Sequence, residues 1–166
     1  GKYYESGGQW KPELLAEPHV ETVSFVCPSG TDIVIDAGER LAFDHSVTAT
    51  SDSDLTPGFF VRRGGKYVVE TTYARVRGHP LRLRAGETAS VRWSLAFNLP
   101  AGVYEVGYHV RDIDGGYHDY KNRACTVTVG DDPRVKGEVY VALELSERME
   151  EAEVPDVTLQ DVRSAR

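Results

Sequence analysis

The stretch that decides the fold is ASVRWSLAF, residues 89–97. Its large apolar side chains fall on every second position, so Val91, Trp93 and Leu95 share one face and polar residues share the other. This period of two is that of a β-strand with one buried face, because successive side chains of a strand point to opposite sides of the sheet. The stretch therefore predicts a strand with Trp93 in the core.

The same alternation recurs on both sides of this stretch, in short runs separated by Gly, Pro, Asp and Asn. Tyr104 lies in the middle of one such run, which places it in the core. Paired glycines within 63–66 suit the tight turn of a hairpin. The further predicted strands are 20–27, 41–49, 59–62, 67–72, 104–111, one that ends with 125–129, and 137–145. About eight strands without a convincing helix predict an all-β domain, an antiparallel β-sandwich of the jelly-roll or immunoglobulin-like kind.

Three zones divide the chain. Its 166 residues suffice for one domain around one core. Residues 1–18 mix glycine, proline and charges without a period, which predicts a linker arm. Residues 19–145 carry the strands and predict the sandwich, and residues 146–166 predict an acidic C-terminal tail. The first residues show no basic start followed by an apolar run, so we expect no secretory signal.

The charge balance excludes several partner classes. The chain has 19 Lys and Arg against 26 Asp and Glu, a formal net charge of -7. Nucleic acids and anionic lipids are themselves negatively charged, so neither is expected as the main partner. The apolar runs are far shorter than the ~20 residues that cross a bilayer as a helix. We therefore expect no nucleic-acid binding and no membrane span.

The two cysteines, Cys27 and Cys125, lie on apolar strand patterns and lack a metal-binding spacing such as C-x-x-C. We expect them to be free, buried thiols, which fits a reducing cytoplasm. An antibody-type domain is excluded because the two cysteines are too far apart and Trp93 comes too late between them. Arg123 also stands where such domains place a tyrosine.

Catalytic and cofactor motifs are not found in the sequence. It contains neither G-x-S-x-G nor H-E-x-x-H, and its five histidines are dispersed. The run 112–116 resembles the start of a calcium loop, but Arg123 stands where the last acidic ligand belongs, so a hairpin turn is expected. Gly64-Gly65-Lys66 lacks the preceding glycine of a phosphate-binding loop. We expect no enzyme, cofactor or metal, although paired carboxylates for glycoside hydrolysis stay open because their separation is invisible in sequence.

Several short stretches, taken in order, carry a family resemblance. They are ERLAF at 39–43, VRRGGKYV at 61–68, LRLRAGE at 81–87, LPAGVYEV at 99–106, VTVG at 127–130 and GEV at 137–139. Their order and spacing resemble the C-terminal carbohydrate-binding domain of the Wzt-type ATP-binding subunit of O-antigen polysaccharide ABC exporters. Thr71-Thr72 departs from the Asn-Thr pair usual in that region of the family.

The resemblance implies a non-catalytic, jelly-roll-like module. Family members recognise the finished, often capped, non-reducing end of a lipid-linked polysaccharide in the cytoplasm, at the inner face of the inner membrane, and couple chain completion to export. The implied partners are bacterial polysaccharide, the exporter's ATPase domain and permease, and a second copy in a homodimer. The connector 130–133 could let the strand at 137–145 cross to a partner sheet.

Binding a glycan requires aromatic rings that stack on sugar faces and charged or amide groups that bond pairs of hydroxyls. Strand parity places suitable side chains together on two neighbouring strands. The candidate residues are Glu105, His109 and Arg111 on one strand and His118, Tyr120 and Asn122 on the next, with Arg92 joining them if its strand is a neighbour.

A second candidate set is Tyr67, Glu70 and Tyr73. The alternative interpretation of all these residues is a solvated outer face. The alternative function is a structural β-sandwich that mediates protein-protein assembly.

Overall fold

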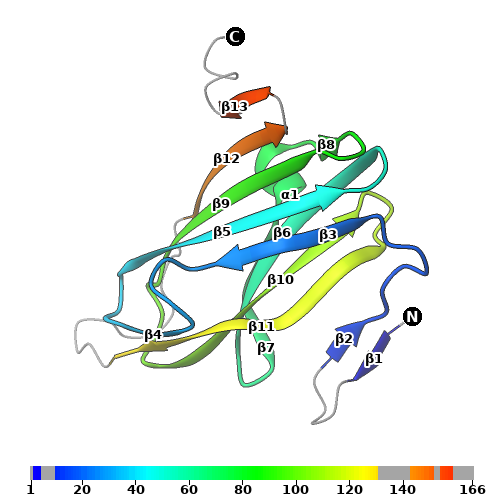
Figure 1. Cartoon of the computed structure of the whole chain (residues 1–166). Coiled ribbons are helices and arrows are strands. Elements are labelled where there is room, and N and C mark those ends of the chain that lie inside the picture. Colours follow the sequence, from blue (N-terminus) through cyan, green and yellow to red (C-terminus); the bar gives the residue numbers. More distant parts are fainter. Residues whose placement is uncertain (1, 5–9, 131–142, 152–153, 159–166) are drawn as a thin grey trace.

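The structure, a computed structural model, describes residues 2–4, 10–130, 143–151 and 154–158. All of its described strands except the pair β1 (Lys2–Tyr4) and β2 (Trp10–Pro12) form two sheets packed face to face (Figure 1). The first, the β10 sheet, has the order β4 (Asp32–Ile35), β11 (Tyr117–Val129), β10 (Gly102–Asp112), β6 (Ser53–Arg63) and β7 (Lys66–Thr72), with β8 (Leu81–Leu83) also on β6. The second, the β5 sheet, has the order β13 (Val154–Thr158), β12 (Leu143–Glu151), β9 (Thr88–Ala96), β5 (Arg40–Ala49) and β3 (Val20–Val26). The prediction of an all-β sandwich is confirmed.

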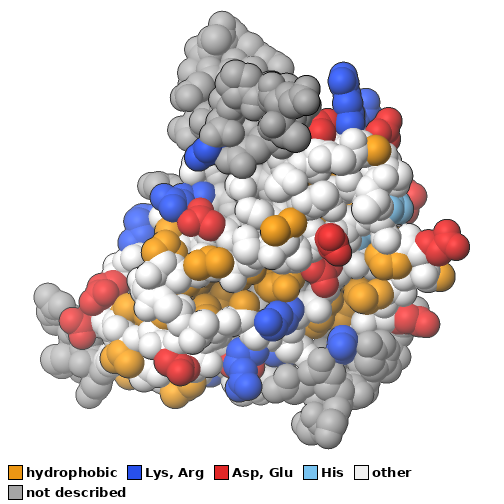
Figure 2. Space-filling view, viewed as in Figure 1, with side chains coloured by type: hydrophobic (Ala, Val, Ile, Leu, Met, Phe, Trp, Pro, Cys, Tyr) orange, Lys and Arg blue, Asp and Glu red, His pale blue; other side chains and the backbone are white. Residues whose placement is uncertain are grey.

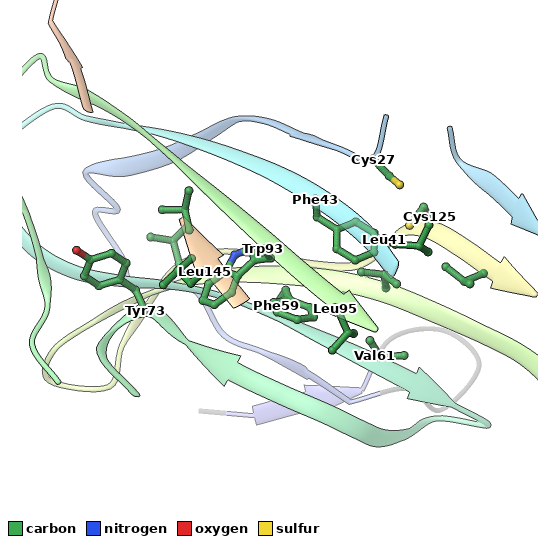
Figure 3. Close-up of a cluster of buried hydrophobic side chains, with 14 of the residues drawn as sticks. Cys27, Leu41, Phe43, Phe59, Val61, Tyr73, Trp93, Leu95, Cys125 and Leu145 are labelled. Carbon is green, nitrogen blue, oxygen red and sulfur yellow. The ribbon is translucent and has the colours of Figure 1, made fainter. Parts of the chain in front are cut away.

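The core lies between the two sheets. Trp93 and Tyr104 are both buried there, as their alternation predicted. The Trp93 ring packs on Phe59 at 5.0 Å between centroids, so the two sheets meet through aromatic contacts (Figure 3). Cys27 and Cys125 are free and buried, and burial raises the pKa of the Cys125 thiol to about 12. The Cys125 thiol therefore stays protonated at neutral pH.

The sequence pattern did not predict two short strands, β4 and β8. β4 and β8 span only four and three residues, too few for an alternation to stand out. β4 runs parallel to β11, whereas the other strand pairs of the two sheets are antiparallel in the described part of the chain. The remaining strands of the two sheets, except β13 within the expected acidic tail, overlap the ranges expected from the sequence.

The two ends of the chain contribute strands of their own. β1 (Lys2–Tyr4) pairs with β2 (Trp10–Pro12) within the expected linker arm. β12 pairs with β9 from Leu143 to Glu150, so the sheet continues past residue 145 into the expected acidic tail. Residues 137–142 of the expected last strand lie outside the described residues.

One short helix, α1 (Tyr73–Arg77), follows β7. Thr72 is its N-cap and accepts a hydrogen bond from the Arg75 backbone N–H, and Gly78 ends it in the left-handed region at φ +83°. Arg77 donates to the buried Glu147 of β12 at 2.7 Å, which ties the helix to the β5 sheet. α1 is the only helix in the described ranges and is too short to cross a membrane.

Candidate functional site

The outer face of the β10 sheet carries a cluster of rings, which we call the aromatic face. Its register places His109 beside both Tyr120 of β11 and Gly58 of β6, and Phe60 beside Glu70 of β7. The four neighbouring strands β11, β10, β6 and β7 thus contribute to one surface. The aromatic face consists of Phe60, Tyr67, His109, Tyr117 and Tyr120, bordered by the charged residues Arg62, Glu70, Glu105 and Arg111.

The floor of the aromatic face is made by Phe60 and His109, which are 0% and 1% exposed although they point away from the core. Two glycines make this possible. A Cβ at Gly107 would overlap the Phe60 ring, and one at Gly58 would lie 2.5 Å from His109 Cε1. Both rings therefore pack against bare backbone, at positions where the carbonyl oxygens of Thr71 and Lys121 also leave no room for a Cβ.

Three tyrosines stand around this floor. Tyr120 stacks on Phe60 at 5.4 Å, and its hydroxyl lies 3.2 Å from that of Tyr67. Tyr117 meets Tyr120 edge to face at 6.0 Å. Burial raises the pKa of all three phenols, so each is a neutral O–H that can donate or accept a hydrogen bond. Tyr67 is the most open of them at 44% exposed.

Charged side chains are held at fixed places beside the rings. Nε2 of His109 lies 3.5 Å from Oε1 of Glu70. Hydrogen bonding to His109 is the main cause that lowers the pKa of Glu70, and the charges of Arg75 and Arg111 add to it. Burial lowers the pKa of His109, so its ring is neutral at pH 7 and Glu70 is a carboxylate.

Two arginines lie over rings of the face. The Arg111 guanidinium is centred 4.9 Å from the Tyr117 ring, and that of Arg62 lies 5.4 Å from the Phe60 ring. Arg62 also approaches Glu105 at 3.5 Å. Arg111 also donates through Nη2 to the Gly115 carbonyl at 3.3 Å, which fixes the guanidinium beside the ring. Arg111 additionally lines a hollow of about 410 Å³ together with Thr56, Thr72, Arg75 and His79.

The structure brings most of the expected site residues together. Glu105, His109, Arg111 and Tyr120 share the aromatic face, and so do Tyr67 and Glu70 of the second set. The two candidate sets are thus one surface, because β6 lies between β10 and β7. Sequence reasoning had no access to this strand order.

Three of the predicted residues, Arg92, Tyr73 and His118, do not join the surface. Arg92 lies on the outer face of the β5 sheet, where it forms two bonds of 2.8 and 2.9 Å with Asp44, because β9 neighbours β5 and β12 instead. Figure 2 views the molecule from this side and shows charges of both signs scattered over it. Tyr73 points into the core. Asn122 does lie beside the face: it is 8% exposed, much like Tyr120, and its backbone carbonyl accepts a 3.0 Å hydrogen bond from Arg62.

His118 is displaced from the face by a β-bulge. Val110 pairs with Asp119, but Arg111 pairs with Tyr117, so β11 holds one extra residue at this point. The bulge inverts the parity, and Tyr117 takes the place that parity assigned to His118. The His118 ring instead contacts His19 at 4.4 Å between centroids.

Tyr117, Phe60 and Arg62 are the residues of this surface that sequence reasoning missed. Gly58 and Gly107 inside strands were a usable signal for Phe60, because a glycine within a strand often marks a ring packed on the backbone. Nothing in the sequence marks the bulge that recruits Tyr117. Among the described residues, no group of three His, Cys, Asp or Glu side chains is placed to hold a metal ion.

Comparisons with known proteins identify one matching family model and two similar solved structures. The family model of the Wzt C-terminal domain matches residues 19–141. The crystal structure of the C-terminal domain of Wzt superposes with a TM-score of 0.59 at 13% identity, over 75% of this chain and 86% of that chain. A Niemann-Pick type C2 protein from Japanese carpenter ant gives a TM-score of 0.47 at 10% identity, over 71% of this chain and 98% of that one. No curated protein matches. Since the family model spans more than half of the sequence, the chain belongs to the Wzt C-terminal domain family.

Proposed function

We propose that this chain is a non-catalytic module that binds a bacterial surface polysaccharide of the O-antigen kind on its aromatic face. Family membership supports a carbohydrate-binding role in O-antigen export in general. The observation that carries the proposal is the union of stacked rings with fixed charged groups on one outer sheet face. Most outer faces of sheets are solvated and carry no second layer of buried rings.

The chemistry of the aromatic face suits a sugar chain. The open ring of Tyr67 offers a flat apolar surface to the C–H groups of a pyranose. The Glu70 carboxylate accepts from hydroxyls, and the Arg111 guanidinium donates to them. The hollow beside Arg111 gives the polysaccharide room to continue beyond the rings.

Binding fits this face better than hydrolysis does. A glycosidase needs one carboxyl group with a raised pKa to act as general acid. The pKa of Glu70 is lowered instead, and Glu105 lies against the Arg62 guanidinium. The carboxylates are therefore suited to hold hydroxyls.

The finer details of the proposal rest on the family. We place the bound segment at the capped, non-reducing end of a lipid-linked polysaccharide. The partners are then the ATPase domain and the permease of the exporter, at the cytoplasmic side of the inner membrane, and the module works as a homodimer.

The test is an array of O-antigen polysaccharides, capped and uncapped, followed by titration of the tightest ligand. Tyr67→Ala and Arg111→Ala each remove one contact worth about 1 to 3 kcal/mol, so affinity falls roughly five- to hundredfold. Arg92→Ala is the matched control, because it removes an exposed arginine from the other sheet. We expect this control to bind like the parent chain.

Two results would contradict the proposal. Failure of the parent chain to bind any polysaccharide would remove the function. Normal binding by both Tyr67→Ala and Arg111→Ala would move the site away from the aromatic face. Preference for capped over uncapped ligand tests the recognition of the chain end.

A further inference from the structure

The segment Leu14–His19 contacts both residues of the β11 bulge, Tyr117 and His118. Leu14 forms an isolated parallel bridge with Tyr117, and the Leu15 N–H donates to the Tyr117 carbonyl at 2.8 Å. The Leu15 side chain occupies the space above Gly116, where a Cβ would lie 2.5 Å from Leu15 Cδ2. Leu15 therefore packs directly on the bare backbone of Gly116.

The other bulge residue is held by the end of the same segment. The His19 backbone N–H lies 3.4 Å from Nδ1 of His118, and the two imidazole rings touch at 4.4 Å between centroids. His19 is anchored in turn, because its Nδ1 lies 2.8 Å from the Ser53 hydroxyl at the start of β6. Figure 1 shows this connection between β2 and β3 passing the end of β11.

This arrangement matters because the bulge decides which side chain reaches the aromatic face. Tyr117 faces His109 and Tyr120, whereas His118 points away. A bulge is a local choice of register, and a shift by one residue would exchange the faces of Tyr117 and His118. The segment contacts both residues in the observed register.

We propose that Leu15 is a positioning residue for Tyr117, and that docking of the segment Leu14–His19 is thermodynamically linked to occupancy of the aromatic face. This inference rests on the proposed function. The link is reciprocal, so a polysaccharide that contacts Tyr117 also tightens the docking of the segment. Residues 16–18 are exposed, so the contacts that hold the segment lie at its two ends.

A double-mutant cycle between Leu15 and Tyr117 tests the proposal, with the tightest polysaccharide of the array as probe. Leu15→Ala removes the side chain that packs on Gly116 and so weakens the docking of the segment beside Tyr117. Restoring this arrangement on binding lowers affinity about two- to tenfold. In the Tyr117→Ala background, Leu15→Ala has no further effect, because the residue on which it acts is gone. Leu15→Met refills the space above Gly116 and restores affinity.

Two further measurements separate positioning from general stability. Leu14→Ala is the matched control, since Leu14 is 38% exposed and its side chain does not fill the space above Gly116; it binds like the parent. Gly116→Ala places a Cβ against the tip of the Leu15 side chain, which must shift, so we expect a loss of affinity in the same direction as with Leu15→Ala. Hydrogen exchange of the Leu15 amide slows when the polysaccharide is bound.

The outcomes distinguish the two proposals. If the parent chain binds no polysaccharide, the proposed function fails and this inference falls with it. If the parent binds and both Leu15→Ala and Gly116→Ala bind as tightly as the parent, only this inference is overturned. Equal losses from Leu15→Ala in the parent and Tyr117→Ala backgrounds would also overturn it, because Leu15 would then act independently of Tyr117.

Discussion

His45 makes the fold sensitive to acid. Its ring is fully buried in the core side of β5, with Nε2 2.9 Å from the Thr22 hydroxyl and the rings of Phe25 and Tyr108 beside it. Burial is the main cause that lowers its pKa from 6.5 to about 3, and the neighbouring charge of His109 adds to it. The folded chain therefore holds this imidazole neutral, whereas the unfolded chain protonates it near pH 6.5.

The sign and size of the effect follow from linkage. A histidine with a lowered folded pKa contributes stability that is complete above its unfolded pKa and is lost as pH falls toward the folded pKa. Each pH unit within that window costs about 1.4 kcal/mol. Allowing for partial titration near pH 6.5, the loss between pH 7 and pH 5 is about 2 kcal/mol from His45 alone. The lowered pKa values of His109 and His118 add losses of the same sign.

Urea unfolding at pH 7 and pH 5 measures this loss. His45→Gln keeps an amide that can bond the Thr22 hydroxyl but does not titrate, so we expect it to lose about 2 kcal/mol less than the parent between the two pH values. His79→Asn is the control, because it replaces a histidine that is exposed and lies outside the core. If His45→Gln loses as much stability as the parent, the buried neutral imidazole is not the source of the acid sensitivity.

Four further predictions concern the fold, the aromatic face and assembly. Trp93→Ala empties a site that is 0% exposed and costs about 3 to 5 kcal/mol in urea unfolding; a loss under about 1 kcal/mol would contradict its place in the core. Gly107→Ala forces Phe60 off the backbone and costs about 1 to 3 kcal/mol, with the melting temperature as readout. Tyr120→Ala loses stability as well as polysaccharide binding, because Tyr120 is only 7% exposed. Light scattering over a concentration series is expected to show a dimer, and a constant monomeric mass would refute this.

Much of the fold was determined by the sequence alone. Alternation with a period of two specified most strands of the two sheets and the core positions of Trp93 and Tyr104. This worked because side-chain parity is a local property, which each strand carries whatever its neighbours are. The thiols of Cys27 and Cys125 were placed in the core by the same argument.

The candidate site was determined only in part. Parity on β10 placed Glu105, His109 and Arg111 on one face correctly, since that strand keeps its alternation in this stretch. The union of this face with Tyr67 and Glu70 needed the strand order, because β6 lies between β10 and β7. Strand order depends on contacts between residues that are distant in sequence, and no local pattern records it.

The tertiary structure alone decided the remaining members of the site. The bulge at the start of β11 places Tyr117 instead of His118 on the aromatic face. Arg92 lies on the other sheet, because β9 pairs with β5 and β12. Phe60 entered the site because Gly107 lies opposite it across the strand pair. A register shift and a ring packed on a neighbouring strand's glycine are properties of paired strands, so they come into existence only when the sheet forms.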